Sequence, residues 1–191
     1  MEDEEIRTFR ATIRGTKPLL MHSTRSMTEA PKLARGEVLP PAKEAELALY
    51  KDKSGRIVIP GDCILGALKA AAPNFKAKGK GKTTLKNFVD SGLEIAGDAV
   101  ISPQEYAVDS RPVVVQRSRI IRSRPIFDEW EATFDVEILD TGTWFDQFDE
   151  KYSKGGILRD VIIYAGKFKG LCDFRPRFGR FELVSFEPVE A

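Results

Sequence analysis

The sequence has few of the residues that bind metals or form disulfides. It contains two cysteines, Cys63 and Cys172, and one histidine, His22. A structural zinc site takes about four cysteine or histidine ligands at characteristic spacings, which these residues do not offer. The two cysteines lie far apart in the sequence and are expected to be reduced thiols. We therefore expect no metal ion and no cofactor.

Long hydrophobic runs are also missing. No apolar run approaches the roughly 20 residues of a transmembrane helix, and the first segment, MEDEEIRTF, is acidic where a signal peptide would be basic and then apolar. We expect a cytoplasmic protein without a membrane partner. The 42% hydrophobic and 31% charged residues are typical of a globular chain, and 191 residues suit one domain.

A phosphate-binding loop for nucleotides is absent, although residues 59–86, IPGDCILGALKAAAPNFKAKGKGKTTLK, contain the letters GKT. The motif G-x-x-x-x-G-K-[ST] needs a glycine where this sequence has Lys76, and it follows a strand, whereas this segment follows a predicted helix. We expect a mobile loop over residues 76–82. A flexible polycation of this kind suits a phosphodiester backbone.

Charge of one sign is missing from three stretches of the chain. Residues 69–86 and 111–124 contain no acid, and residues 128–150 contain no lysine or arginine. The basic residues are Lys69, Lys76, Lys78, Lys80, Lys82, Lys86, Arg111, Arg117, Arg119, Arg122 and Arg124. Such segregation favours a positive face for a polyanion, or contacts between copies of the chain. The alternative is a solvated surface on which the charges neutralise one another.

The order of the predicted elements indicates an α+β fold. Strands are predicted over residues 5–15, 56–60, 93–102 and 180–189, and helices over residues 42–52, 61–72 and 157–170. The helix at 61–72 places Ile64, Leu65, Leu68 and Ala71 on one face. The major elements then follow the ferredoxin-like (RRM-like) order of strand, helix, strand, strand, helix, strand. We expect one domain over residues 1–191 with an antiparallel sheet and insertions at about 16–55 and 74–108.

The clearest strand signal lies in residues 112–139. Two extended runs join near Pro125 and predict a long antiparallel hairpin. In the second run the apolar residues alternate with polar ones and are expected to face the core: Trp130, Ala132, Phe134, Val136 and Ile138. In the first run Arg117, Arg119, Arg122 and Arg124 are expected to point outward and to bind phosphates. The alternative is pairing with acids of the second run, such as Glu129 and Glu131.

A third basic group, GLCDFRPRFGRFEL (residues 170–183), interleaves arginines with aromatic rings. Such a pattern suits base stacking and phosphate contact, and its candidate residues are Phe174, Arg175, Arg177 and Arg180. Phe181 is expected in the core. His22 is a weak candidate for a general base in a metal-independent ribonuclease, against the alternative of a histidine without a chemical role.

Two segments resemble a known family. IPGDCILGALK (residues 59–69) is similar to the IPGSSLKGALR signature of the RAMP superfamily, and GLCDFRPRFGRFEL resembles the glycine-rich loop and last strand of those proteins. RAMP proteins form the backbone of CRISPR effector complexes and include guide-processing endonucleases. The resemblance implies a subunit that polymerises along a single strand, with a thumb formed by residues 111–139 or by the lysine loop. Small RAMP-like proteins of phages and prophages are similar as well.

Three functional hypotheses follow. The first is a non-catalytic protein that coats single-stranded RNA or DNA, by head-to-tail assembly of a homo-oligomer or as a subunit of a ribonucleoprotein complex. The second is a metal-independent RNA endonuclease that uses His22. The third is a protein-interaction module whose basic and acidic faces pair it with a partner.

Overall fold

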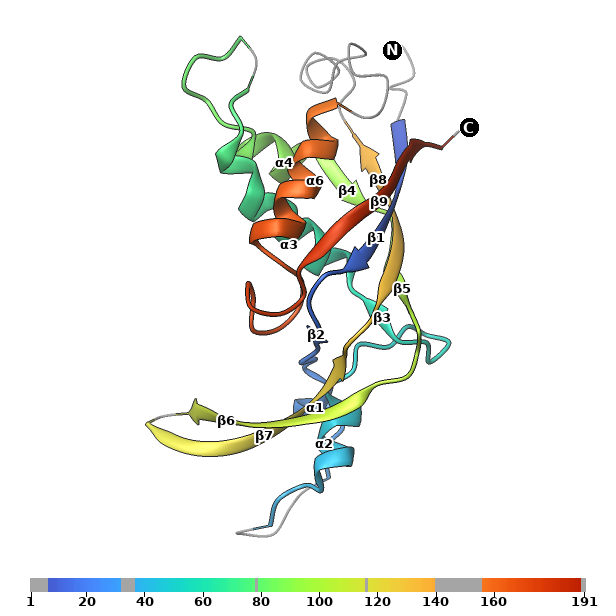
Figure 1. Ribbon diagram of the computed structural model, residues 1–191, viewed down its shortest axis with the longest axis vertical. Helices are drawn as coiled ribbons and strands as arrows, with labels where there is room; N and C mark the ends of the chain where they lie inside the picture. The colour runs from blue at the N-terminus through green and yellow to red at the C-terminus, as the bar shows by residue number, and fades with distance from the viewer. Residues whose placement is uncertain (1–6, 32–36, 78, 116, 140–155, 190–191) are drawn as a thin grey trace.

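The computed structural model describes residues 7–31, 37–77, 79–115, 117–139 and 156–189. Helices cover one face of the larger sheet, and a long curved hairpin projects beyond one end of that sheet (Figure 1). No helix of the described residues is long and apolar enough to cross a membrane.

The larger sheet contains the predicted ferredoxin-like core. Its elements are β1 (Arg7–Gly15), α3 (Gly61–Ala71), β4 (Leu93–Ile95), β8 (Glu131–Ile138), α6 (Gly156–Phe168) and β9 (Phe181–Pro188). β1 lies between β8 and β9 and is antiparallel to both, and β4 pairs with β8. Two further strands, β3 (Val58–Ile59) and β5 (Ala99–Ser102), extend the sheet beyond β8. The α+β, ferredoxin-like prediction is confirmed.

Alternation along β8 separates a core face from a wet face, as the sequence predicts. The apolar residues from Trp130 to Ile138 are at most 4% exposed. Two acids of the other face pair with arginines of β1: Asp135 lies 2.8 Å from Arg10, and Glu131 lies 3.1 Å from Arg14. Asp135 and Glu131 therefore neutralise arginines of β1. The alternative in which the acids of this run pair with Arg117 to Arg124 is wrong for Glu131, which pairs with Arg14.

α3 begins and ends where the sequence predicts. It follows Pro60 and ends at Ala71, two residues before Pro73, whose missing N–H and ring prevent a longer α-helix. Ile64, Leu68 and Ala71 are buried against α6 and the sheet, and Leu65 packs against the same core. A further short helix, α4 (Lys86–Gly92), was not predicted and leads into β4.

The predicted hairpin exists, but its turn lies elsewhere. β6 (Ala107–Val115) pairs with β7 (Ser118–Phe127), so the chain reverses between Val115 and Ser118 and not near Pro125. β8 belongs to the other sheet. Pro125 lies inside β7 opposite Val108, and its carbonyl accepts a hydrogen bond from the Met21 amide at 3.3 Å. β2 (Leu19–Leu20) completes the three-stranded sheet on the other side of β7.

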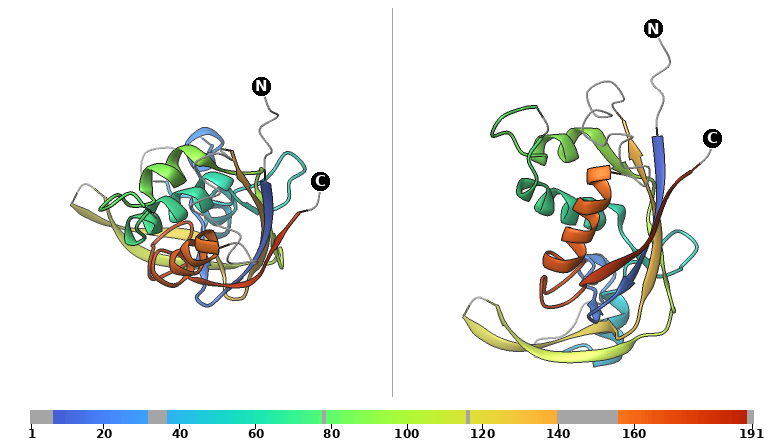
Figure 2. Two further views of the ribbon diagram at one scale, coloured as in Figure 1. Left: turned by 90° about the horizontal axis from the view of Figure 1, so that it is seen from above. Right: turned by 45° about the horizontal axis from the view of Figure 1, so that its top comes forward.

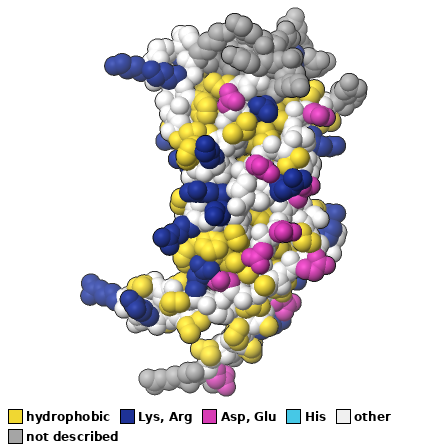
Figure 3. Space-filling model, viewed as in Figure 1, with side chains coloured by type: hydrophobic (Ala, Val, Ile, Leu, Met, Phe, Trp, Pro, Cys, Tyr) yellow, Lys and Arg dark blue, Asp and Glu magenta, His cyan; other side chains and the backbone are white. Residues whose placement is uncertain are grey.

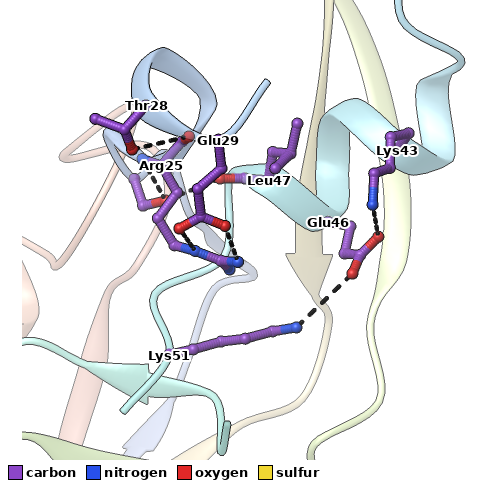
Figure 4. A network of polar contacts seen from close by, with 8 residues as sticks. Arg25, Thr28, Glu29, Lys43, Glu46, Leu47 and Lys51 are labelled. Carbon is purple, nitrogen blue, oxygen red and sulfur yellow. Dashed lines mark hydrogen bonds and ion pairs between the residues drawn. The ribbon is translucent and has the colours of Figure 1, made fainter. Parts of the chain in front are cut away.

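The excursion after β1 is folded against this hairpin. It contains α1 (Arg25–Thr28) and α2 (Pro41–Leu47), so the predicted helix at 42–52 is present but ends early. Figure 4 shows the polar contacts here: Arg25 lies 2.6 Å from Glu29, and Glu46 lies 2.9 Å from Lys43 and 4.0 Å from Lys51. These cations are neutralised locally, so they do not add to a binding surface.

Candidate nucleic-acid interface

The tip of the β6–β7 hairpin carries two exposed arginines. The two strands pair in one register over their whole length, and Arg117 turns the chain with a left-handed φ of 69°. Arg119 follows on β7. Both side chains are exposed, and neither makes an ion pair with a residue of the described ranges. The hairpin thus holds two uncompensated positive charges away from the core.

The other two arginines of this run are paired. Arg122 lies 3.0 Å from Glu44 of α2, and the same carboxylate accepts a hydrogen bond from the Ser123 amide at 3.0 Å. The Arg124 side chain is only 7% exposed and lies 2.7 Å from Asp173. The expectation that all four arginines point outward is therefore wrong for Arg124.

Arg124 lies at the junction between the hairpin and the loop that joins α6 to β9. Its guanidinium carbon is 5.1 Å from the centre of the Phe174 ring. From β6, Arg111 approaches the same ring at 5.5 Å and the Phe178 ring at 4.6 Å, within the range of cation–π attraction. The Phe174 and Phe178 rings meet edge to face at 6.4 Å. Two arginines and two aromatic rings thus fasten the hairpin to the loop.

This glycine-rich loop, residues 169–180, is also held by its backbone. The Asp173 amide donates to the Leu20 carbonyl at 3.0 Å, and the Gly179 amide donates to the Pro18 carbonyl at 2.8 Å. Gly179 has a φ of 70°, and a Cβ there would collide with the Leu171 backbone. Glycine is required at this position because it alone tolerates both the backbone conformation and the close approach.

The candidate residues of the loop differ in exposure and in whether their side chains already have a partner. Arg175 and Arg177 are exposed and make no ion pair within the described part of the chain. Arg180 donates from Nε to the Pro176 carbonyl at 2.7 Å, so part of its guanidinium is engaged. Phe174 is 38% exposed, whereas Phe181 is 4% exposed and belongs to the core, as expected.

The base of the lysine loop between α3 and α4 is held by backbone hydrogen bonds, whereas the sequence predicts a mobile loop. The Ala77 amide donates to the Thr83 carbonyl at 2.8 Å, and Lys76 and Thr84 form a β-bridge. Lys80 and Lys82 lie in the loop beyond this bridge. They and Lys76 are exposed, and none of the three makes an ion pair with a described residue. Lys78 lies outside the described residues. Lys69 lies on α3, 2.7 Å from Asp90, and is neutralised.

The three basic segments lie along one edge of the molecule. The lysine loop, the glycine-rich loop and the hairpin tip follow one another down the same side in Figure 1 and in the right-hand view of Figure 2. Figure 3 shows Lys and Arg side chains projecting along this edge, while most Asp and Glu side chains visible on that face lie toward the opposite edge. We call this surface the basic edge. Its cations without an ion pair to another described residue are Lys76, Lys80, Lys82, Arg117, Arg119, Arg175 and Arg177.

A cavity of about 320 Å³ opens beside the glycine-rich loop, between His22, Tyr50, Cys63 and Cys172. The His22 Nδ1 lies 3.8 Å from the Asp173 carboxylate. Burial and the nearby Arg124 charge nevertheless hold the pKa of His22 below its ordinary value of 6.5. A lowered pKa favours the neutral imidazole at pH 7, the form that accepts a proton. Within the described residues, no three His, Cys, Asp or Glu side chains are placed to hold a metal ion.

Sequence reasoning missed the groups that organise this junction. Asp173 and Phe178 lie inside the segment singled out for its arginines and phenylalanines, yet their contacts with Arg124 and Arg111 depend on a hairpin whose turn was misplaced. The meeting of Cys63 with Cys172 had no signal in the sequence.

No protein-family model matches this chain, and no curated protein matches it. Among solved structures, it is similar to a chain in the cryo-EM structure of the Type III-B Cmr-beta bound to cognate target RNA, with a TM-score of 0.60 and 11% identity over 97% of this chain. This protein spans 61% of that chain. The likeness shows a shared fold, in agreement with the ferredoxin-like strand order of the larger sheet.

Proposed function

We propose that this protein is a non-catalytic RAMP-like subunit of a ribonucleoprotein complex, folded as one domain, that binds single-stranded RNA along its basic edge. The observation that carries this proposal is the edge itself. Three segments far apart in the sequence bring to one side of the molecule seven cations that have no ion pair within the described part of the chain, while other basic residues nearby are neutralised by acids. A nucleic-acid strand carries one phosphate per nucleotide, so many separate cations can each neutralise a phosphate and strengthen binding.

The geometry also supports a single strand over a duplex. The glycine-rich loop presents Phe174, which is 38% exposed, beside Arg175 and Arg177, so the exposed part of its ring can contact a base near the bound phosphates. Bases are free to stack in this way only when they are unpaired. RNA is favoured over DNA because the structural neighbour is described as bound to cognate target RNA.

Membership in a larger assembly is supported by apolar side chains on the hairpin. Val114 is 68% exposed and Ile121 is 70% exposed, on an arm that projects from the core. Large apolar side chains on a projecting arm are suited to contact with another subunit. Head-to-tail assembly along the strand is the form of contact we propose, and light scattering with strands of increasing length measures it.

The test of the proposed function is fluorescence anisotropy with labelled single-stranded RNA, single-stranded DNA and duplex DNA over a range of salt concentrations. We expect the tightest binding to single-stranded RNA, with an affinity that falls steeply as salt rises. If single-stranded DNA binds as tightly as single-stranded RNA or more tightly, the preference for RNA in this proposal is wrong. If none of the three binds at low salt, the basic edge is a protein-contact surface and the interaction-module hypothesis replaces this one.

The endonuclease hypothesis has one supporting observation: His22 borders the cavity beside the glycine-rich loop, and its lowered pKa favours the neutral imidazole at pH 7. Incubation of the protein with labelled RNA tests it. Cleavage that disappears in His22→Ala while binding is retained would establish it, and intact RNA with the wild-type protein would remove it.

A further inference from the structure

Two thiols from distant parts of the sequence meet at the cavity beside the glycine-rich loop. Cys63 lies in the first turn of α3, and Cys172 lies in the loop between α6 and β9. Both are free and half-buried, and both border the same cavity of about 320 Å³. A small molecule in that cavity lies beside both cysteines.

The surroundings make the two thiols chemically unequal. Contact with Cys172 and the positive charge of Arg175 hold the pKa of Cys63 below its ordinary value of 9.0, although Asp62 opposes this. The N-terminal turn of α3 also favours a thiolate there. The same contact and burial raise the pKa of Cys172 above 9.0. Cys63 is therefore the nucleophile of the pair, and Cys172 keeps its proton until the second step.

We propose that Cys63 and Cys172 form an oxidation site for a peroxide, which converts them into a disulfide that ties the glycine-rich loop to α3. The Cys63 thiolate attacks one peroxide oxygen, the O–O bond breaks, and the departing oxygen takes a proton and leaves as water, so that Cys63 becomes a sulfenic acid. The Cys172 sulfur then attacks the Cys63 sulfur. The S–O bond breaks, and the hydroxide takes the Cys172 proton and leaves as a second water. Two thiols lose two electrons, and the peroxide gains them.

Closing this bond acts on the junction that positions the hairpin. Cys172 directly precedes Asp173, which faces Arg124 of β7, and Phe174, which packs against Arg111 and Arg124. A disulfide brings the sulfur atoms to about 2.05 Å and so draws this part of the loop toward α3. The effect on RNA rests on the proposed function: the disulfide form binds RNA several-fold more weakly than the dithiol form.

The site itself is tested on the full chain without any nucleic acid. Hydrogen peroxide is expected to remove both titratable thiols and to lower the intact mass by about 2 Da, with the change reversed by dithiothreitol. In Cys172→Ser, the sulfenic acid on Cys63 is expected to be trapped by dimedone. In Cys63→Ser, Cys172 is expected to react far more slowly. Two titratable thiols left after peroxide, or a disulfide found only between chains, would overturn the site.

The consequence for binding is tested separately by anisotropy with single-stranded RNA. We expect the oxidised wild-type protein to bind several-fold more weakly than the reduced protein, and peroxide to leave the affinity of Cys63→Ser unchanged. Equal affinities for the two forms would overturn the link to binding while the site stands. No binding by either form overturns the proposed function and, with it, the link to binding. The chemical test of the dithiol is unaffected by that result.

Discussion

The guanidinium of Arg124 lies between two partners of different kinds, the carboxylate of Asp173 at 2.7 Å and the ring of Phe174 at 5.1 Å. Arg124 belongs to the hairpin and both partners belong to the glycine-rich loop. The contact joins two of the three segments of the basic edge. It also explains why a residue from an arginine-rich run is buried: the charge of Arg124 joins the hairpin to the loop, while Arg117 and Arg119 at the tip have no ion pair with a described residue.

Removing the charge of Asp173 is expected to weaken the fold. Asp173→Asn leaves the buried guanidinium without its counter-charge, which costs about 2 kcal/mol of the free energy of unfolding, less than for a fully buried pair because Asp173 is 27% exposed. Urea denaturation measures this. The matched control is Glu29→Gln, which breaks the more exposed pair with Arg25 and is expected to cost less than about 1 kcal/mol. Similar destabilisation of both variants would show that the Arg124 pair has no special role.

The pKa of the single histidine, His22, reports on the electrostatics at the junction between the hairpin and the glycine-rich loop. Burial and the Arg124 and Arg122 charges lower the pKa of His22, and Asp173 and Glu44 oppose them only in part. The NMR titration midpoint of His22 is therefore expected below 6.5.

Because the unfolded chain binds this proton more readily than the folded one, the stability linked to His22 is present above pH 6.5 and falls as the pH drops through the lowered pKa. In Asp173→Asn the midpoint is expected to fall further, since this variant lacks a carboxylate that favours the imidazolium. A wild-type midpoint at or above 6.5 would mean that Asp173 outweighs burial and the arginines.

The strand alternation of β8 and the helix limits of α3 could be predicted because local chemistry decides them. Residues from Trp130 to Ile138 alternate between a core and a solvent face, and Pro60 and Pro73 bracket a helix with one apolar face. The hairpin turn could not be predicted. It contains Arg117 in a left-handed conformation and no glycine or asparagine at residues 116–117, while the proline that indicated a turn lies within β7.

The sequence predicts which residues of the basic edge are cationic, but not which basic residues already have an acidic partner. The sequence identifies every cation of the edge, yet it does not tell Lys69 and Arg122, which have acidic partners, from Lys80 and Arg119, which have none among the described residues. That distinction depends on Asp90 and Glu44, which come from elements whose packing no local pattern specifies. The meeting of Cys63 with Cys172 depends in the same way on the docking of the glycine-rich loop beside α3.

Paired and unpaired lysines are expected to differ in their effect on binding. In the double variant Lys80→Ala and Lys82→Ala, the affinity for single-stranded RNA should fall several-fold at low salt, because the proposed complex loses two charges that would neutralise phosphates. Lys69→Ala should leave the affinity nearly unchanged, since that charge is already balanced by Asp90 at 2.7 Å. Anisotropy titrations compare the variants. An equally large effect of Lys69→Ala would mean that general positive charge, and not the edge, attracts the strand.

The hairpin tip offers the sharpest test of RNA binding along the basic edge, with a control of the same charge change. Arg119→Glu reverses a charge at the tip that is unpaired within the described residues. Lys53→Glu reverses an exposed charge, likewise unpaired there, in the turn between Lys51 and Ile57, which lies at the opposite edge in Figure 1. The two variants have the same net charge, so bulk electrostatics affects them alike.

The measurement is the slope of the logarithm of the binding constant against the logarithm of salt concentration, for single-stranded RNA and each of the two variants. We predict that Arg119→Glu binds several-fold more weakly than wild type, with a slope shallower by about 0.7 for each phosphate that the protein no longer neutralises, while Lys53→Glu keeps the wild-type slope. Equal slopes and affinities for the two variants would place the RNA somewhere other than the basic edge.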